Sequence, residues 1–302
     1  MKILVTGATG QTYGPVAEAL ARTADEVWCL ARFKDPKQRE QFEAAGFKTA
    51  VWNMGVDDLG HVPNDFTHVL HAATMRDSDD PKGVMSINSV GTGMLMTHCR
   101  NAKAFLVVST FAVYRPKPLD HAYAETDTVS GNSPGRPAYG ASKMIQEGAV
   151  HAFARTLGLP SVIARMNTAY GPRGRGGMPV RFFRMMLEGK PIPTPLDGAD
   201  EWHNPIHADD LARQVPLLWD VAGIVPTTVN WAGDDTISIR QMVDYISEIS
   251  GVEAQYERVE HTLTPKASDN TYRRSLIGSC DVQWKDGVRR ALQAQFPDRT
   301  FL

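Results

Sequence analysis

The sequence predicts an α/β fold, a doubly wound parallel sheet with a smaller C-terminal lobe, and three observations predict it. Short apolar runs alternate with amphipathic helical stretches as far as Arg165. The runs are apolar at consecutive positions, which is typical of parallel strands covered on both faces. After Arg165 the alternation stops and glycine- and proline-rich chain begins. Such alternation forms βαβ units, and therefore a parallel sheet with helices on both faces.

The expected elements follow one another at regular spacing. Strands are expected at residues 3–6, 26–31, 48–51, 68–71, 105–109 and 162–165, and the strand pattern returns at 228–231. Helices are expected near residues 13–23, 35–46, 84–100 and 138–157, and later near 178–189, 239–250 and 284–296. Ser238, with Gln241 three residues later, forms a capping box that marks the start of the helix at 239.

The composition excludes several classes of protein. The 302 residues are 42% hydrophobic and 22% charged, which is ordinary for a globular chain. A net charge of -2 without a basic stripe argues against a nucleic-acid partner. The three cysteines are widely spaced and form no metal-ligand pattern, so neither a disulfide framework nor a metal site is expected. No targeting segment or membrane-spanning run is visible, and we expect a cytoplasmic protein with no membrane partner.

The first expected strand leads directly into a glycine loop. Backbone N–H groups of such a loop can approach a pyrophosphate, and the N-terminus of the following helix adds partial positive charge. A tight turn without a ligand is the alternative, but the place between a first strand and a helix favours dinucleotide binding. We therefore expect a Rossmann-type domain that holds a dinucleotide through Gly7, Thr9, Gly10, Gln11 and Thr12.

The end of the second strand indicates which dinucleotide is bound. An acidic residue there would bind the ribose 2′-hydroxyl of NAD, whereas an arginine accommodates the 2′-phosphate of NADP. The strand ends in Ala31-Arg32, with Lys34 and Lys37 nearby and no acidic residue. A solvated loop arginine is the alternative for Arg32. The sequence therefore predicts NADP as the cofactor, with NAD as the less favoured choice.

A tyrosine and a lysine lie four residues apart in the helix expected at 138–157. Tyr139 and Lys143 would face the same side of that helix, one turn apart. A neighbouring ammonium group lowers the pKa of a phenol and makes it useful for proton transfer near neutral pH. Ser109 and Thr110 end the preceding strand at its carboxyl edge, where ligands bind in open α/β sheets. Either hydroxyl could bind a substrate oxygen or cap a turn.

Together these residues resemble the extended short-chain dehydrogenase/reductase family, in particular its NAD-dependent epimerase/dehydratase branch. The resemblance covers nearly the whole chain. Four further segments match in order: Val69-Leu70-His71-Ala72-Ala73, Asn88-Ser89-Val90-Gly91-Thr92, Arg165-Met166-Asn167-Thr168-Ala169-Tyr170-Gly171-Pro172 and Ile206-His207-Ala208-Asp209-Asp210-Leu211.

The resemblance implies roles for individual residues. Thr110 would be catalytic, Tyr139 the acid/base and Lys143 its partner, with both of the latter also holding the cofactor. Asn88 would support the active-site helix, and Asn167 would face the substrate. Residues expected to line the cofactor are Asn53, Met54, Ala72, Ala73, Thr74, Ser109 and Met166, and those expected near the substrate are Thr110, Phe111, Trp202 and His203.

The sequence departs from the family pattern in three places. Tyr13 stands where the third glycine of the loop is usual, and Gly14 follows it. A gapless match to the family puts Tyr13 at the position where helix and loop pack closely. A loop that is longer by one residue would put Gly14 at that position. Phe111-Ala112 follows Thr110, where the 4,6-dehydratases of the family carry Asp-Glu, so dehydratase chemistry is not expected. His203 lies nearest the position of an arginine that binds the diphosphate of nucleotide sugars, and imidazole is a weaker clamp than guanidinium.

These features predict an oxidoreductase, a ketone reductase or alcohol dehydrogenase, acting on a small-molecule substrate. A nucleotide-sugar 4-epimerase is the first alternative, and a dinucleotide-sensing protein without turnover is an alternative of another class. We expect the dinucleotide-binding domain at residues 1–170, with 205–235 returning to it, and a substrate-binding lobe at 171–204 and 236–302. The resemblance also implies a homodimer formed by the helices near 84–100 and 138–157.

Overall fold

The computed structural model describes the chain except for residues 11, 77–79, 134–136 and 261–265. The chain forms two compact units. The first unit comprises residues 1–116, 125–165 and 212–229, and the second comprises 117–124, 166–211 and 230–302.

A seven-stranded sheet forms the centre of the first unit. Its order is β12-β7-β5-β4-β1-β2-β3, and the pairs among β1 to β5 are parallel, with Leu4 of β1 opposite both Val69 and Trp28. The order confirms the predicted doubly wound arrangement, because the chain runs outward from β1 to β3 and then returns to β4. The strands are β1 (Lys2–Thr6), β2 (Glu26–Ala31), β3 (Lys48–Val51), β4 (His68–His71), β5 (Ala104–Thr110), β7 (Ser161–Met166) and β12 (Thr227–Trp231).

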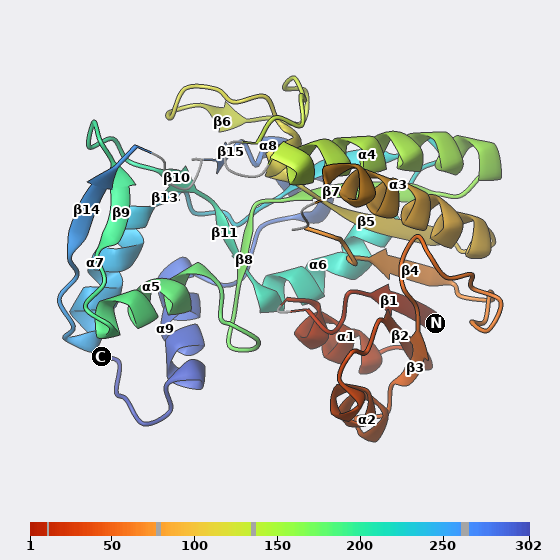
Figure 1. Cartoon of the computed structure of the whole chain (residues 1–302), viewed down its shortest axis with the longest axis horizontal. Helices are drawn as coiled ribbons and strands as arrows, with labels where there is room; N and C mark the ends of the chain where they lie inside the picture. The colour runs from red at the N-terminus through yellow and green to blue at the C-terminus, as the bar shows by residue number, and fades with distance from the viewer. Residues whose placement is uncertain (11, 77–79, 134–136, 261–265) are drawn as a thin grey trace. The chain divides into compact units, whose positions relative to one another are not determined.

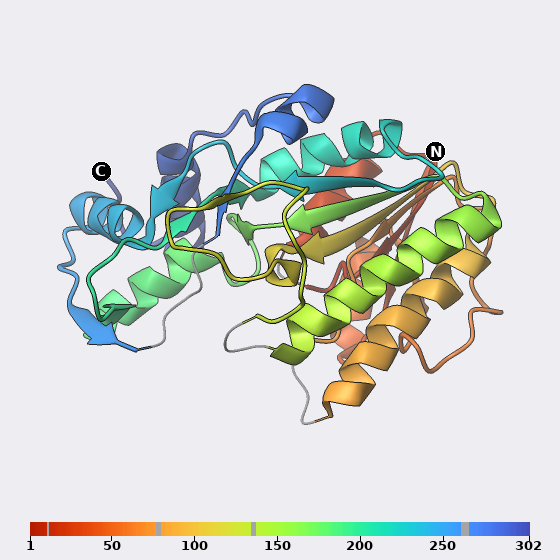
Figure 2. The same ribbon diagram turned by 90° about the horizontal axis from the view of Figure 1, so that it is seen from above.

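Helices cover both faces of this sheet. Two long helices, α3 (Pro81–His98) and α4 (Pro137–Leu157), lie side by side on one face, and α1 (Tyr13–Ala21) lies on the other (Figure 1, Figure 2). Between the sheet and α3 with α4 lies a core that includes Leu4, Phe105 and Val150, all fully buried. The remaining helices with residues in this unit are α2 (Pro36–Ala44), the short 3-10 helix η1 (Phe111–Val113) and α6 (Ala208–Asp220).

The second unit packs three helices around its own apolar cluster. Phe183 of α5 (Met178–Leu187), Ile246 of α7 (Ile239–Ser250) and Leu292 of α9 (Trp284–Gln295) are fully buried in it. The predicted capping box of α7 is present, with Ser238 and Gln241 bonded reciprocally. Short strand pairs complete the unit: β8 (Thr168–Tyr170) with β11 (Pro205–His207), β9 (Ile192–Pro195) with β14 (Tyr256–Val259), β10 (Trp202–His203) with β13 (Ile237–Ser238), and β6 (Ala122–Tyr123) with β15 (Ala267–Ser268).

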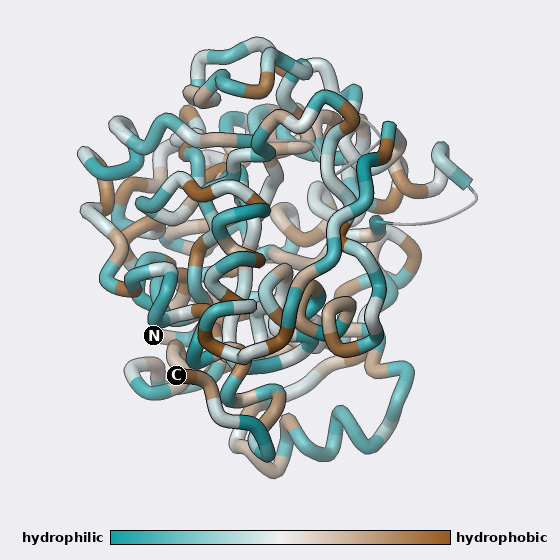
Figure 3. The backbone as a smooth tube through the Cα atoms, turned by 90° about the vertical axis from the view of Figure 1, so that its left-hand side faces the viewer, coloured by the Kyte–Doolittle hydropathy of each residue, from teal (hydrophilic) through white to brown (hydrophobic). Residues whose placement is uncertain are grey.

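Several elements of the second unit have no counterpart among the expected ones. These are the short strands, α8 (Thr271–Ile277) and the first residues of α6, whose remaining residues belong to the first unit. The strands are only two to four residues long, so each carries too little hydropathic period to stand out in the sequence. Figure 3 colours the backbone by hydropathy, and apolar and polar residues alternate over short distances along it. Among the described residues, no helix is long and apolar enough to cross a membrane.

Candidate active site

The glycine loop closes against the end of a neighbouring strand. Gly7 has a φ of +78°, and a Cβ there would lie 2.8 Å from the carbonyl carbon of Ala72 and the nitrogen of Ala73. Gly10 donates its N–H to the Gly7 carbonyl at 2.9 Å, which folds the loop into a tight turn before α1. Only glycine permits this approach at position 7, so the cradle fits the close backbone contact that a pyrophosphate needs. Thr9 and Thr12 lie in the same loop, whereas Gln11 is outside the described residues.

Tyr13 and Gly14 lie where the family has the third glycine of the loop, the residue that lets the helix pack closely against it. A Cβ at Gly14 would lie 3.2 Å from the carbonyl oxygen of Ala8, so Gly14 provides the close approach of helix to loop. Tyr13 begins α1 and its side chain is 7% exposed, so this residue also packs closely against its surroundings. Burial raises the pKa of the Tyr13 phenol, and the nearby Tyr139 raises it further. Tyr13 thus lies within electrostatic range of the predicted acid/base.

Asn88 joins the loop after β4 to the helix that carries Tyr139 and Lys143. Its side chain is fully buried and bonds both the N–H and the carbonyl of Met75, at 2.8 and 2.9 Å. It also donates to Ser142 Oγ at 2.9 Å, and Ser142 donates in turn to the Tyr139 carbonyl at 2.8 Å. Ala72, Ala73 and Thr74 lie in this loop, half-buried. The structure thus places Asn88 where it can position α4 against the expected cofactor loop.

Tyr139 lies beside the carboxyl end of β5 because a glycine follows it. A Cβ at Gly140 would lie 2.7 Å from the carbonyl oxygen of Ala112, so this contact requires glycine. Thr110, the last residue of β5, accepts a hydrogen bond from the Ala112 N–H at 3.2 Å. Phe111 and Ala112 are buried in η1, at 1% and 5% exposure. The contact brings the segment that begins with Thr110 next to the N-terminal turn of α4, where Tyr139 lies.

Lys143 is buried and held by two hydrogen bonds. Its Nζ donates to the Val108 carbonyl at 2.7 Å and to Gln146 Oε1. The side chain is 2% exposed, and burial lowers its pKa to about 7, opposed by Glu147 and assisted by Arg76. Burial thus moves the pKa of Lys143 from its ordinary value of 10.5 toward neutral pH.

A chain of buried hydrogen bonds continues from Lys143 to the glycine loop. Gln146 donates to Thr92 Oγ1 at 2.6 Å, and His71 pairs with Thr92 through Nε2 at 2.9 Å and with Thr6 through Nδ1 at 2.7 Å. Thr6 Oγ1 also accepts the Ala73 N–H at 3.0 Å. Burial, assisted by the charge of Lys143, lowers the pKa of His71 to about 3, so this imidazole is neutral at physiological pH.

Ser109 belongs to a second buried network and not to the surface of the site. Its hydroxyl donates to Glu147 Oε1, and the serine is 2% exposed. Glu147 also forms a salt bridge with Arg165 at 2.8 Å, and both side chains are less than a tenth exposed. Arg165 Nη1 donates to the Tyr114 hydroxyl at 3.0 Å. With its hydroxyl engaged inside the protein, Ser109 leaves Thr110 as the strand-end hydroxyl suited to bind a substrate oxygen.

One cation lies close to the predicted acid/base. The guanidinium carbon of Arg76 lies 5.6 Å from the centre of the Tyr139 ring. Sequence reasoning did not identify Arg76, His71, Gln146 or Glu147. Glu147 follows Lys143 by four residues on the same helix, so helical spacing alone could have indicated it.

The other predicted cofactor residues occupy different environments. Arg32 and Asn53 are exposed, just beyond β2 and β3. Asn53 donates its backbone N–H to Asp57 at 2.8 Å. Met54 is 8% exposed, and its Cγ packs so closely on Gly91 of α3 that a Cβ at Gly91 would clash with it. The Met54 side chain therefore belongs to the core, and only its backbone could line an adenine.

Four predicted residues lie in the second unit. Asn167 donates from Nδ2 to the Lys266 carbonyl at 2.6 Å, and Met166 ends β7 just before it. Trp202 and His203 form β10, and the Trp202 carbonyl accepts the Lys266 N–H at 2.8 Å. His203 is 5% exposed, and burial lowers its pKa to about 4, so its imidazole is neutral at physiological pH. Lys266, which sequence reasoning missed, thus lies beside both Asn167 and β10.

Comparison with known proteins places the chain in a family. The sequence pattern of the NAD dependent epimerase/dehydratase family matches residues 3–230, which is most of the chain. The chain therefore belongs to the NAD-dependent epimerase/dehydratase family, as its resemblance to extended short-chain dehydrogenases/reductases predicts.

Individual relatives have similar folds and sequences. A UDP-glucuronate 4-epimerase of Thermodesulfobacterium geofontis is 28% identical over 239 residues, covering 74% of this chain and 70% of that protein. The structure of a UDP-glucuronic acid 4-epimerase from Bacillus cereus, in complex with UDP-glucuronic acid and NAD, superposes with a TM-score of 0.82 at 25% identity, covering 97% of this chain and 98% of that one. An uncharacterised UDP-glucose epimerase of Bacillus subtilis is 29% identical over 163 residues. The chain spans only part of the length of the first curated relatives that it matches. The match covers 49% of the Bacillus subtilis protein and 34% of the next relative, a trifunctional enzyme of Arabidopsis thaliana.

Proposed function

We propose that this chain is a nucleotide-sugar 4-epimerase that uses NAD. Support for the proposal comes from Thr110 at the end of β5 together with Tyr139 and Lys143 on α4, where Lys143 donates to the Val108 carbonyl of β5. No acidic residue directly follows Thr110. Phe111 and Ala112 are buried apolar residues, so that segment has no carboxylate for a dehydratase step. Similarity to 4-epimerases over nearly the whole chain supports the same choice.

The residues of the site have distinct parts in this reaction. Tyr139 takes the proton of the substrate hydroxyl and returns it after epimerisation. Lys143 lowers the pKa of the phenol through its positive charge. Thr110 Oγ1 accepts the Ala112 N–H with a lone pair, so its own proton can be donated to the substrate oxygen. When bound, the nicotinamide supplies the acceptor for the hydride from the carbinol carbon and gives it back.

The proposal is tested by incubating the protein with NAD and either UDP-glucose or UDP-glucuronic acid, and following the C4 epimer by proton NMR. We expect the epimer to accumulate without net consumption of NAD. Tyr139→Phe should lower the rate by about 100-fold or more, because general acid–base catalysis is lost. If neither sugar is converted while a simple ketone is reduced at the expense of NADH, the protein is a ketone reductase.

The ketone reductase or alcohol dehydrogenase is the second candidate. One observation favours it: a buried, neutral His203 stands near the position expected for an arginine that clamps a diphosphate. A single imidazole binds a diphosphate less strongly than a guanidinium fork does.

The cofactor is proposed to be NAD, as the family description and the NAD-bound neighbour support. The alternative is NADP, which the exposed Arg32 after β2 favours. Titration with NADH and NADPH separates the two. If NAD is the cofactor, the protein should bind NADH more tightly than NADPH. The affinity of Arg32→Ala for NADH should then stay within about threefold of the parent's. A loss of NADPH affinity of about tenfold in Arg32→Ala would instead assign Arg32 to a 2′-phosphate.

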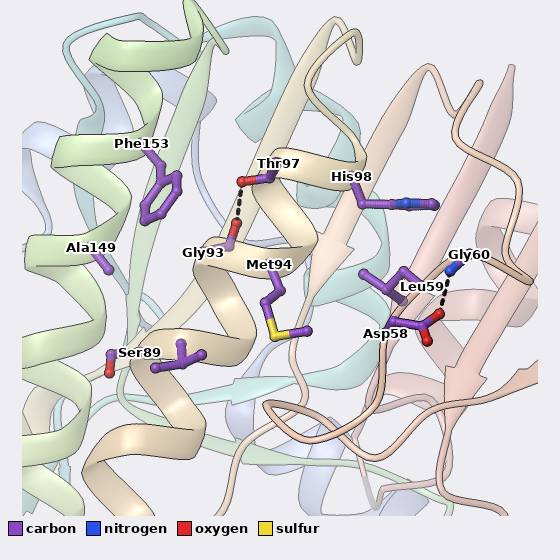
Figure 4. A pocket seen from close by; sticks show the side chains of 11 residues that line it. Asp58, Leu59, Gly60, Ser89, Gly93, Met94, Thr97, His98, Ala149 and Phe153 are labelled. Atoms are coloured by element: carbon purple, nitrogen blue, oxygen red, sulfur yellow. Dashed lines mark hydrogen bonds between the residues drawn. The ribbon is translucent and has the colours of Figure 1, made fainter.

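We also propose that two copies of the chain associate through α3 and α4. An open hollow of about 620 Å³ lies on the outer side of these helices, and Figure 4 shows Phe153 of α4 and Met94 of α3 beside it. Val90, on the same surface, is 48% exposed, and Ile145 of α4 is 40% exposed. Pairing these helices with those of a second copy would bury this apolar surface, as the resemblance to the family implies.

A further inference from the structure

Gln146 of α4 is a polar side chain that is fully buried. A buried amide loses its hydrogen bonds to water, so its oxygen and nitrogen need partners inside the protein. Gln146 has both kinds of partner. Its Oε1 accepts a hydrogen bond from Lys143 Nζ, and its Nε2 donates to Thr92 Oγ1 at 2.6 Å. Gln146 therefore joins the lysine of the site to α3, which carries Thr92.

Thr92 determines which way the Gln146 amide is turned. The Thr92 hydroxyl donates its proton to the Asn88 carbonyl at 2.7 Å, so its oxygen accepts from Gln146 and does not donate to it. An amide turned the other way would present its NH₂ group to the Lys143 ammonium, donor against donor. The carbonyl oxygen of Gln146 therefore faces Lys143.

The same direction of donation extends to the strand before the glycine loop. The Thr6 oxygen accepts the Ala73 N–H at 3.0 Å, and the Thr6 proton is available to His71 Nδ1 at 2.7 Å. The proton of the neutral His71 ring is then on Nε2, which donates to Thr92 at 2.9 Å. Both lone pairs of Thr92 Oγ1 are thereby occupied, one by His71 and one by Gln146.

The ammonium group of Lys143 has three N–H donors, and the described residues engage two of them. One bonds to the Val108 carbonyl at 2.7 Å and the other to Gln146 Oε1. Because the three N–H bonds are arranged tetrahedrally, two fixed bonds determine the direction of the third. We propose that Gln146 is a positioning residue: its oxygen, held toward Lys143 by Thr92, keeps the ammonium group charged and fixes the direction of its remaining N–H bond. The consequence for turnover rests on the proposed function.

The charges around Lys143 show why an amide suits this position. Burial lowers the pKa of Lys143 to about 7, Glu147 opposes this shift, and Arg76 adds to it. His71 is neutral, since burial lowers its pKa to about 3. Gln146 adds a hydrogen-bond acceptor without a negative charge. The positive charge of Lys143 thus remains available to lower the pKa of a neighbouring phenol.

The titration of Lys143, in the full chain before NAD is added, tests this role directly. Lysine labelled with ¹³C at Cε gives an NMR signal that follows protonation of Nζ, and the signal missing from Lys143→Arg identifies Lys143. Gln146→Leu should lower the midpoint of the titration by about one pH unit or more, because the charged form loses a hydrogen-bond acceptor. Gln146→Glu keeps an acceptor and adds a negative charge, so it should raise the midpoint.

Two variants of Thr92 separate orientation of the amide from its presence. Thr92→Val should lower the midpoint by a smaller amount than Gln146→Leu, because the amide is then able to turn. Thr92→Ser keeps the hydroxyl and should leave the midpoint within about 0.3 pH units of the parent's. Thr156→Val is the control, since Thr156 is exposed on the same helix as Gln146, and it should change neither titration nor turnover.

Turnover gives the second readout. In Gln146→Leu, kcat for epimerisation should fall about tenfold with KM for the sugar within about threefold, because a misplaced ammonium affects the transition state and not sugar binding. The melting temperature verifies that each variant is folded. Gln146→Glu and Thr92→Val decide the question if Gln146→Leu does not fold.

The proposal is overturned if the folded variants at 146 and 92 titrate as the parent does, or if an active parent loses no kcat in Gln146→Leu. Failure of the proposed function would appear differently, as absence of epimer from the parent while the shifts in the Lys143 titration persist.

Discussion

At the scale of single residues, Lys143 illustrates how burial shapes chemistry. Its ammonium group is enclosed by the Val108 carbonyl and Gln146, and desolvation lowers its pKa to about 7. In the unfolded chain the same amine has an ordinary pKa of 10.5. Between these two values the unfolded state binds one more proton than the folded state, so the free energy of unfolding rises with pH.

We predict that this rise disappears in Lys143→Met. Without bound cofactor, the free energy of unfolding of the parent should increase relative to that of the variant by about 1 to 2 kcal/mol between pH 7 and 9. Below pH 7 both states of the parent hold the proton, so the two curves should run parallel. Urea unfolding from pH 6 to 9 measures the difference. Parallel curves over the whole range would show that Lys143 keeps an ordinary pKa.

At the scale of elements, the approach of α4 to the end of β5 depends on one glycine. We predict that Gly140→Ala costs about 1 to 3 kcal/mol of stability, because its Cβ would clash with the Gly131 carbonyl oxygen and lie 2.7 Å from that of Ala112. The added methyl group must therefore displace α4, η1 or the segment at Gly131. Epimerase activity should fall with it. Thermal unfolding and turnover measure the two effects.

Gly148→Ala is the control on the same helix. A Cβ at Gly148 would meet nothing within 4 Å, so alanine should stabilise α4 by about 0.5 to 1 kcal/mol and leave turnover unchanged. Equal effects of the two substitutions would contradict the assigned contact at Gly140.

The strands and helices of the sheet are largely predictable from sequence. The bounds of β2, β3 and β4 are those expected. β2 shows the continuous apolar run of a buried parallel strand, Val27-Trp28-Cys29-Leu30-Ala31, whereas the edge strand β3 exposes Lys48 and Val51. The short parallel pair β9 and β14 was not predictable, since its partners are more than sixty residues apart and its sequence holds prolines. Pairing between distant short strands is decided by tertiary packing and not by local pattern.

At the scale of the whole molecule, the proposed pairing of α3 and α4 predicts a dimer. Val90→Glu should shift the sedimentation of the protein from dimer to monomer, because a charge would be buried in an apolar contact. Val225→Glu is the control, since Val225 is 65% exposed and does not line the hollow. A parent protein that sediments as a monomer would exclude the proposed association.

The sequence alone determined the class of this protein and the residues that define its candidate chemistry. The hydropathic periods identify the sheet, and the spacing of Tyr139 and Lys143 places both on one side of a helix, because these are local properties of the chain. Only the tertiary structure decided that Ser109 bonds to Glu147, that His71 joins Thr6 to Thr92, and that Lys266 lies beside His203. These pairs join residues far apart in sequence, and their contacts depend on how separate elements pack.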